Sequence, residues 1–180
     1  MNKILKILIV IVLVVLGLLA YMGFFNTITF TEGESGPYTF VYEDFVGEYA
    51  ETGPLFDEIY ESLVDNGIET ELGLGIYYDN PDEVDASELR SRVGSVVTEE
   101  QAQLADEAGV PYKIMTVDPI NAVITEFPYR NMLSYMVGPM KVYPKMTEYI
   151  AEKGYGAAPC YELYDMENNK IFYMCEIVSK

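Results

Sequence analysis

Residues 159–177 read PCYELYDMENNKIFYMCEI, and this stretch predicts an antiparallel hairpin at the end of the chain. Two runs rich in β-forming residues flank the dipeptide Asn168-Asn169, whose residues tolerate positive φ with little strain. With a two-residue turn at this dipeptide, Glu162 lies opposite Cys175. The remaining elements can be placed around this hairpin.

Each strand of the predicted hairpin carries one carboxylate, Glu162 in the first strand and Glu176 in the second. Side chains alternate between faces, so Glu162 shares a face with Tyr164, whereas Glu176 lies on the other face, opposite Tyr161. At most one of the two acids can therefore enter a given cleft. A carboxylate covered by aromatic groups could hold a cation or exchange a proton. The alternative is that one or both acids point to water.

The only two cysteines, Cys160 and Cys175, fall on the two hairpin strands. The expected register places them on the same face but diagonal to each other, so a disulfide would need a small register shift. An oxidising compartment would favour that bond, and two buried free thiols are the alternative.

The absence of histidine narrows the possible chemistry. It removes imidazole general bases, Ser-His and Cys-His nucleophile pairs, and ordinary structural zinc sites. The acidic loop at residues 79–85 lacks the alternating oxygen ligands and closing glutamate of a helix-loop-helix calcium site. We therefore predict no metal and no cofactor, and any catalysis would depend on carboxylates and tyrosines.

The charge of the chain is strongly negative, with a formal net charge of −18 over 180 residues. The first 25 residues contain Lys3 and Lys6 and no acid, so all 29 acidic side chains lie in residues 26–180. Such a surface repels nucleic acid and anionic headgroups and favours cations. Nucleic acid is therefore not an expected partner.

The N-terminus predicts a membrane anchor. Residues 7–25 carry no charge, and at about 1.5 Å per residue they can cross a hydrocarbon core of roughly 30 Å. Ala20-Tyr21-Met22 does not provide the small-x-small site of a cleaved signal peptide. Lys3 and Lys6 would stay cytoplasmic, which places the rest of the chain on the extracytoplasmic side of a single-pass membrane protein, with a cytosolic placement as the alternative.

The remaining pattern predicts a polar linker over residues 26–37 and an α+β domain over residues 38–180. Strand and helix signals follow in the order strand, helix, strand, strand, and this order then repeats, with residues 54–94 similar in pattern to residues 139–177. Two such modules side by side would form a groove at their junction, where small ligands usually bind.

Two further patterns bear on packing. Gly73 and Gly75 alternate with apolar residues in a predicted strand and leave one face bare, so that a helix, another backbone or a ligand can approach. Met132, Met136 and Met140 recur at fourfold spacing in a predicted helix. A methionine stripe of this kind most often fills a core, and the alternative is a promiscuous binding wall.

Five blocks carry a family resemblance: GEYAETGPLF (47–56), YYDNP (77–81), LRSRVGSV (89–96), FPY (127–129) and IFYMC (171–175). Together they resemble the GyrI-like small-molecule-binding superfamily over about residues 38–177. The likeness is greatest to a membrane-anchored branch that includes a testis-expressed ER-phagy receptor.

The resemblance implies two strand-helix-strand-strand (SHS2) modules with a ligand cleft between them. In the superfamily an acidic residue on a late strand, within an aromatic-lined cleft, receives cationic or drug-like ligands. Glu162 and Glu176 are the positions that match this pattern. The candidates for the aromatic wall, each of which could equally be a core residue, are Tyr42, Tyr78, Phe127 and Tyr173.

These observations lead to three hypotheses of function. The first is a membrane-anchored protein that binds a small hydrophobic or cationic ligand in an acidic cleft. Some superfamily members hydrolyse strained rings with a carboxylate, so the second is a carboxylate-dependent hydrolase of small electrophiles. The third is a protein-interaction scaffold whose groove is filled by Met and Tyr side chains.

Overall fold

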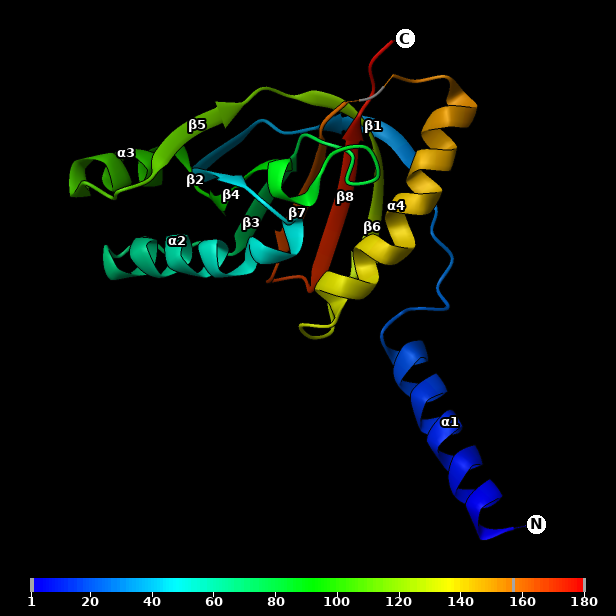
Figure 1. The fold of residues 1–180 in the computed structure, drawn as a ribbon. Coiled ribbons are helices and arrows are strands. Elements are labelled where there is room, and N and C mark those ends of the chain that lie inside the picture. Colours follow the sequence, from blue (N-terminus) through cyan, green and yellow to red (C-terminus); the bar gives the residue numbers. More distant parts are fainter. Residues whose placement is uncertain (1, 157, 180) are drawn as a thin grey trace.

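The computed structural model describes residues 2–156 and 158–179 of the chain. A helix extends from a domain that combines helices with one curled sheet (Figure 1). The helices are α1 (Lys3–Tyr21), α2 (Gly53–Asp65), α3 (Glu99–Ala108) and α4 (Ser134–Lys153). The strands are β1 (Thr31–Ser35), β2 (Tyr38–Val46), β3 (Leu72–Tyr77), β4 (Arg90–Val96), β5 (Lys113–Val117), β6 (Ile120–Pro128), β7 (Cys160–Asp165) and β8 (Lys170–Glu176).

The expected α+β repeat is present. The first module is β2-α2-β3-β4 and the second is β6-α4-β7-β8. The two modules form one eight-stranded sheet, in the order β1-β6-β8-β7-β3-β4-β2-β5. All neighbouring strands are antiparallel, and the modules join where β3 pairs with β7.

Helices cover one face of the sheet. The other face is buried because the sheet curls and its own strands pack against each other there. Helix α2 packs on β4 and β2, and α4 packs on β6. On the helix-free face, Phe40 of β2, Leu74 of β3 and Met174 of β8 belong to one buried cluster. Because β2 and β8 lie four places apart in the sheet, a shared cluster requires strong curling.

Helix α1 has the length and composition of a membrane span, and signal sequences share these properties. The segment that follows it differs from the expected linker. Residues 31–35 form β1, which pairs with β6 from Thr31 opposite Ile124 to Ser35 opposite Ile120. This edge strand satisfies backbone groups of β6 that would otherwise be unpaired.

The hairpin β7–β8 has a wider turn than expected, and the expected register was wrong by two residues. Residues 166–169 form the turn, and the Asp165 carboxylate accepts hydrogen bonds from the backbone and side-chain amides of Asn168. Cys160 therefore lies directly opposite Cys175, and the two form a disulfide. The expected diagonal placement of the two cysteines was wrong, because the side chain of Asp165 stabilises a four-residue loop.

The expectation that the methionine stripe fills a core was also wrong. The buried face of α4 consists of Ser134, Gly138, Val142 and Met146. Met132, Met136 and Met140 are instead 80%, 58% and 68% exposed. Gly138 explains this rotation of the helix, because a glycine lets α4 approach β8 closely.

Candidate functional site

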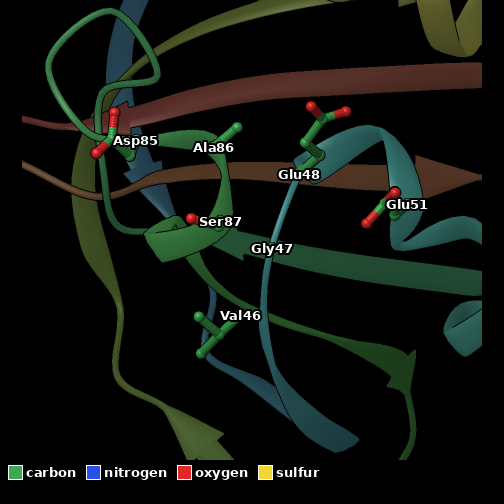
Figure 2. A pocket seen from close by; sticks show the side chains of 7 residues that line it. All are labelled: Val46, Gly47, Glu48, Glu51, Asp85, Ala86 and Ser87. Atoms are coloured by element: carbon green, nitrogen blue, oxygen red, sulfur yellow. The ribbon is translucent and has the colours of Figure 1, made fainter.

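Two hollows on the surface lack the acids that the sequence predicts as site residues. One is lined by Val46, Gly47, Glu48, Glu51, Asp85, Ala86 and Ser87 (Figure 2). The other lies between the end of α1, the end of β6 and the turn between β7 and β8, and its lining includes Tyr21, Arg130 and Lys170. Glu162 and Glu176 belong to neither lining.

Glu162 is instead buried in the middle of the sheet, with 6% of its surface exposed. It lies on β7, opposite Gly75 of β3 and Tyr173 of β8. Its face of the sheet is the one that carries α2 and α4. The carboxylate is therefore at the junction of the two modules, where the repeat predicts a groove.

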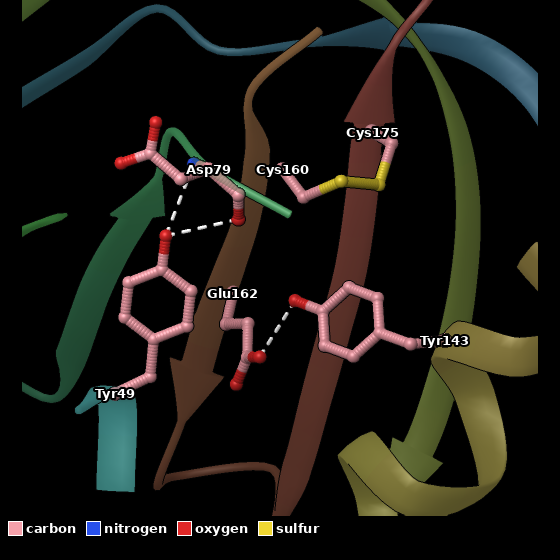
Figure 3. Close-up of a disulfide and its surroundings, with 6 residues drawn as sticks. All are labelled: Tyr49, Asp79, Tyr143, Cys160, Glu162 and Cys175. Carbon is pink, nitrogen blue, oxygen red and sulfur yellow. Dashed lines mark hydrogen bonds between the residues drawn. A yellow bond between two sulfur atoms is a disulfide. The ribbon is translucent and has the colours of Figure 1, made fainter. Parts of the chain in front are cut away.

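Two tyrosine hydroxyls bind the carboxylate. Tyr143 of α4 donates a hydrogen bond of 2.7 Å to Oε1 of Glu162 (Figure 3). Tyr164 of β7 donates another of 2.7 Å to Oε2. The Tyr164 hydroxyl is also 3.2 Å from that of Tyr77 on β3. Both carboxylate oxygens are thus occupied by groups of the protein itself.

No basic side chain forms an ion pair with Glu162 in the described part of the chain. Burial raises the pKa of Glu162, and the hydrogen bonds from Tyr143 and Tyr164 partly oppose this rise. Burial and the nearby carboxylate also raise the pKa values of Tyr143 and Tyr164, so both remain protonated donors. Within residues 2–156 and 158–179, Glu162 is thus a desolvated acid without a countercharge.

Three glycines make room for the tyrosine rings. A Cβ at Gly75 would lie 2.7 Å from the Tyr77 hydroxyl, and one at Gly73 would touch the Tyr164 ring at 3.4 Å. A Cβ at Gly138 would overlap the hydroxyl of Tyr173. The bare face predicted for β3 is therefore filled by tyrosine rings.

A second layer of aromatic rings surrounds these tyrosines. The Tyr49 ring packs against that of Tyr77 at 4.8 Å between centroids, and Phe56 of α2 packs edge-on against Tyr164 at 5.3 Å. The Tyr49 hydroxyl binds the backbone of Asp79, which holds this ring in place (Figure 3). Both modules thus contribute rings to the enclosure of Glu162.

The six predicted site residues divide between the two faces of the sheet. Tyr173 and Phe127 lie on the same face as Glu162 and belong to one buried cluster beneath α4. Tyr42, Tyr78 and Glu176 lie on the helix-free side. There, burial and the charge of Glu176 raise the pKa of Tyr161 to about 12.

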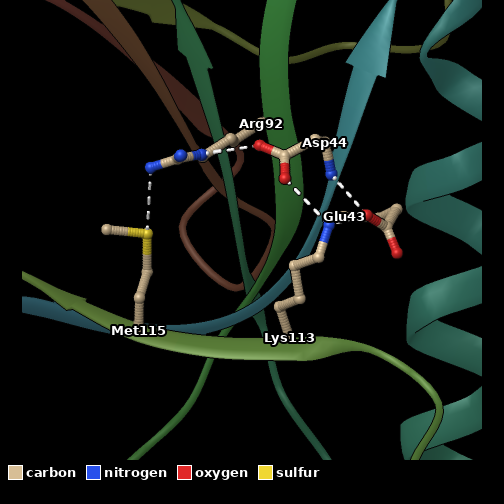
Figure 4. A network of polar contacts seen from close by, with 5 residues as sticks. All are labelled: Glu43, Asp44, Arg92, Lys113 and Met115. Atoms are coloured by element: carbon tan, nitrogen blue, oxygen red, sulfur yellow. Dashed lines mark hydrogen bonds and ion pairs between the residues drawn. The ribbon is translucent and has the colours of Figure 1, made fainter.

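A cation of the protein already covers the rings on the helix-free side. The Arg92 guanidinium lies 5.3 Å from the ring centroid of Tyr42 and 5.6 Å from that of Tyr78. Asp44 pairs with Arg92 at 2.8 Å and also binds Lys113 (Figure 4). These rings therefore contact an intramolecular cation that is itself neutralised.

The sequence did not single out Tyr143, Tyr77 or Gly138 as site residues. Tyr164 was placed on the Glu162 face by strand alternation, but its hydrogen bond was not foreseen. A glycine in the interior of a helix, where alanine is favoured by about 1 kcal/mol, was the available signal for a close contact at residue 138.

The chain is similar to one known protein family and to curated proteins from mouse and human. The family described as "GyrI-like small molecule binding domain" matches residues 33–178. The mouse "Testis-expressed protein 264 homolog" is 31% identical over 167 residues, which cover 87% of this chain and 51% of the mouse protein. The chain spans about half the length of the curated relatives it matches.

Two solved structures share the fold. The EcmrR C-terminal domain aligns with a TM-score of 0.57 and 10% identity, over 85% of this chain and 99% of that domain. The structure of SAV2435 bound to tetraphenylphosphonium aligns with a TM-score of 0.53 and 15% identity, over 83% of this chain and 93% of that one. At these identities the likeness shows the fold alone.

Proposed function

The chain belongs to the GyrI-like family of small-molecule-binding domains, and from this we propose that it is a membrane-anchored protein that binds a lipophilic cation at Glu162. The observation that carries the proposal is the buried carboxylate of Glu162, which has no basic partner among the described residues. A cation would supply the missing countercharge, and the faces of tyrosine rings attract cations further. The SAV2435 relative, which binds tetraphenylphosphonium, supports this ligand class.

We assign the ligand to Glu162 rather than to Glu176. Glu162 has aromatic rings from both modules around it, whereas Arg92 already lies over the rings on the side of Glu176. Phe127 and Tyr173 complete the aromatic wall on the Glu162 side in this proposal. The aromatic rings at Tyr42 and Tyr78 then have a structural role.

The site is closed by tyrosines, so a ligand must displace at least one of them. Tyr143 is the candidate, since it lies on α4 between Pro139 and Pro144. Each proline removes one backbone donor from the helix, which weakens this segment and makes local movement of Tyr143 easier. Binding would then select the fraction of molecules in which Tyr143 has moved away from Glu162.

Two features support a retained anchor with an extracytoplasmic domain. Lys3 and Lys6 precede α1, and positive residues tend to remain cytoplasmic. The disulfide between Cys160 and Cys175 is a bond that persists in oxidising compartments. Both features favour an extracytoplasmic domain.

Equilibrium dialysis of tetraphenylphosphonium against the full chain in nanodiscs, with empty nanodiscs subtracted, tests the assignment. We expect Glu162→Gln to weaken binding by about tenfold or more, because a hydrogen bond or contact to a charged group contributes about 1.5–3 kcal/mol. Glu176→Gln is the matched control and should bind like the wild type. Equal affinity of wild type and Glu162→Gln would refute the role of Glu162.

The same measurement has a pH dependence whose sign is set by Glu162. Its pKa is raised, and only the ionised carboxylate attracts a cation, so affinity should increase as pH rises through that raised pKa. The Glu162→Gln protein should show no such increase. If the variant follows the wild-type profile, another group titrates and the assignment is wrong.

The hydrolase alternative has one specific observation in its favour, which is the raised pKa of a carboxyl group shielded from water. It predicts turnover of a small electrophile, such as an epoxide, that is lost in Glu162→Gln. Ligand binding without turnover would exclude it. Absence of both binding and turnover would favour the third hypothesis, a protein-interaction scaffold whose groove is filled by Met and Tyr side chains.

A further inference from the structure

The first two turns of α4 and the loop before them expose an unusual number of large apolar side chains. Met132, Leu133, Met136 and Met140 are 80%, 55%, 58% and 68% exposed, and we refer to these four residues as the methionine patch. Several large apolar side chains exposed to water on one short segment are unfavourable unless something covers them. Neither the ligand site nor the core uses this patch.

The segments that carry the methionine patch contact the end of α1. A Cβ at Gly23 would be 3.1 Å from Pro128, and the Arg130 guanidinium lies 5.9 Å from the centre of the Tyr21 ring. The Lys141 ammonium donates hydrogen bonds to the carbonyls of Gly23 and Asn26. The end of α1 is therefore held by the same segments that carry the patch.

Figure 1 shows the same arrangement for the whole domain. The start of α4 is at the end of the domain nearest to α1, and α4 then runs away from α1. Helix α3 lies at the far side of the domain. The C-terminal end of a membrane-crossing helix lies at the bilayer interface, so the start of α4 is close to the same level.

From this placement, and resting on the proposed membrane anchor, we infer that the methionine patch inserts into the interfacial layer of the bilayer that α1 crosses. Large apolar side chains next to aromatic and basic ones are typical of segments that lie in this layer. Tyr21 and Phe24 at the end of α1 supply the aromatic groups that membrane interfaces favour.

The distribution of basic residues supports a lipid surface as the occupant. Arg90, Arg92, Lys113, Lys153 and Lys170 each form an ion pair with a carboxylate. In the described part of the chain, Arg130, Lys141 and Lys145 have none. In the sequence, Arg130 precedes the patch and Lys141 and Lys145 follow it. Lys141 holds the end of α1, and this local excess of basic residues favours an anionic lipid headgroup although the domain as a whole is strongly acidic.

The same charges disfavour a second copy of the chain as the occupant. In a symmetric dimer the same surface contacts itself, so the patch of one copy would face the patch of the other. The three basic residues would then approach their own counterparts, and like charges across an interface oppose association. A lipid surface can contact both kinds of group, because its acyl chains accept the apolar side chains and its phosphates attract the basic ones.

A fluorescence experiment on the full chain tests this inference. Met132→Cys, Met136→Cys and Leu104→Cys are each labelled with an environment-sensitive dye, since Cys160 and Cys175 are paired in the disulfide. Leu104 is the control because it is an exposed apolar residue on α3. In phosphatidylcholine vesicles we expect a blue shift and quenching by a lipid-attached quencher at residues 132 and 136, and neither effect at residue 104.

Flotation of the same vesicles separates the two proposals. If the chain floats and the labels at 132 and 136 behave like that at 104, the anchor stands and the inserted patch is wrong. If the chain does not float, the membrane anchor and the inserted patch are both wrong. A blue shift that grows with protein density, without lipid quenching, would identify a second copy as the occupant and overturn the inference.

Discussion

At the scale of single residues, Gly138 and Tyr173 determine how closely α4 approaches the sheet. The Tyr173 hydroxyl is buried and has no hydrogen-bond partner among the described residues. A side chain at residue 138 would overlap it, so the glycine is required in spite of its low helix propensity. This contact also sets the position of Tyr143, which is five residues further along the same helix and binds Glu162.

The contact predicts different effects on stability for substitutions at its two residues. Gly138→Ala should lower the free energy of unfolding by about 1–3 kcal/mol, as overpacking in a core does. Tyr173→Phe should be neutral or stabilising, because it removes a buried hydroxyl that lacks a partner. In the double variant the free energy of unfolding should largely return to the wild-type value, since without the Tyr173 hydroxyl the added methyl group has space.

Urea denaturation followed by circular dichroism measures these changes. Gly53→Ala serves as a control, because a Cβ at Gly53 would meet no atom within 4 Å. If Gly138→Ala is as destabilising in the Tyr173→Phe background as alone, the two residues are not coupled and this explanation of the helix position fails.

At the scale of secondary-structure elements, the hairpin β7–β8 brings the candidate carboxylate next to the disulfide. Cys160 precedes Glu162 by two residues on the same face of β7, and Cys175 lies opposite Cys160 on β8. The covalent bond therefore fixes the register that places Tyr173 opposite Glu162. The four-residue turn stabilised by Asp165 supports the same register from the other end.

Reduction of this disulfide should destabilise the domain by about 3 kcal/mol, the value expected for a closed loop of about 15 residues. The measurement is denaturation of the wild type with and without a thiol reductant. A variant with both Cys160→Ser and Cys175→Ser controls for effects of the reductant itself. Identical transitions of the wild type under both conditions would contradict a formed disulfide.

At the scale of the whole molecule, the two modules share one sheet and should unfold together. The pairing of β3 with β7 places Leu74 opposite Leu163, and Leu74 is fully buried in the cluster that connects strands of both modules. A break at this junction exposes apolar surface of both modules at once. Cooperative unfolding follows from that shared core.

Leu74→Ala therefore should destabilise both modules by a similar amount, about 2–5 kcal/mol for a buried leucine. Hydrogen exchange read by mass spectrometry can follow peptides from β2 and from β8 separately. The solvent-exposed substitution Tyr60→Ala on α2 provides a control with little expected effect. Loss of protection in β2 alone would show that the modules unfold independently.

Local patterns in the sequence were sufficient for the repeated strand-helix-strand-strand order, the apolar helix α1 and the hairpin that contains Glu162. Periodicity of two or 3.6 residues depends only on near neighbours, and it also placed Glu162 and Tyr164 on one face and Glu176 on the other. Periodicity predicts the face of the strand or helix on which a side chain lies. It does not predict which side chain from another element will contact it.

Only the tertiary structure decided which partners meet, because these contacts join segments that are distant in sequence. The hydrogen bond from Tyr143 to Glu162 joins helix α4 to strand β7, and no local pattern pairs these two residues. The methionine stripe of α4 faces outward because Gly138 is the residue that permits close packing on Tyr173. In each case, a three-dimensional contact selected one of the arrangements that the sequence pattern allowed equally.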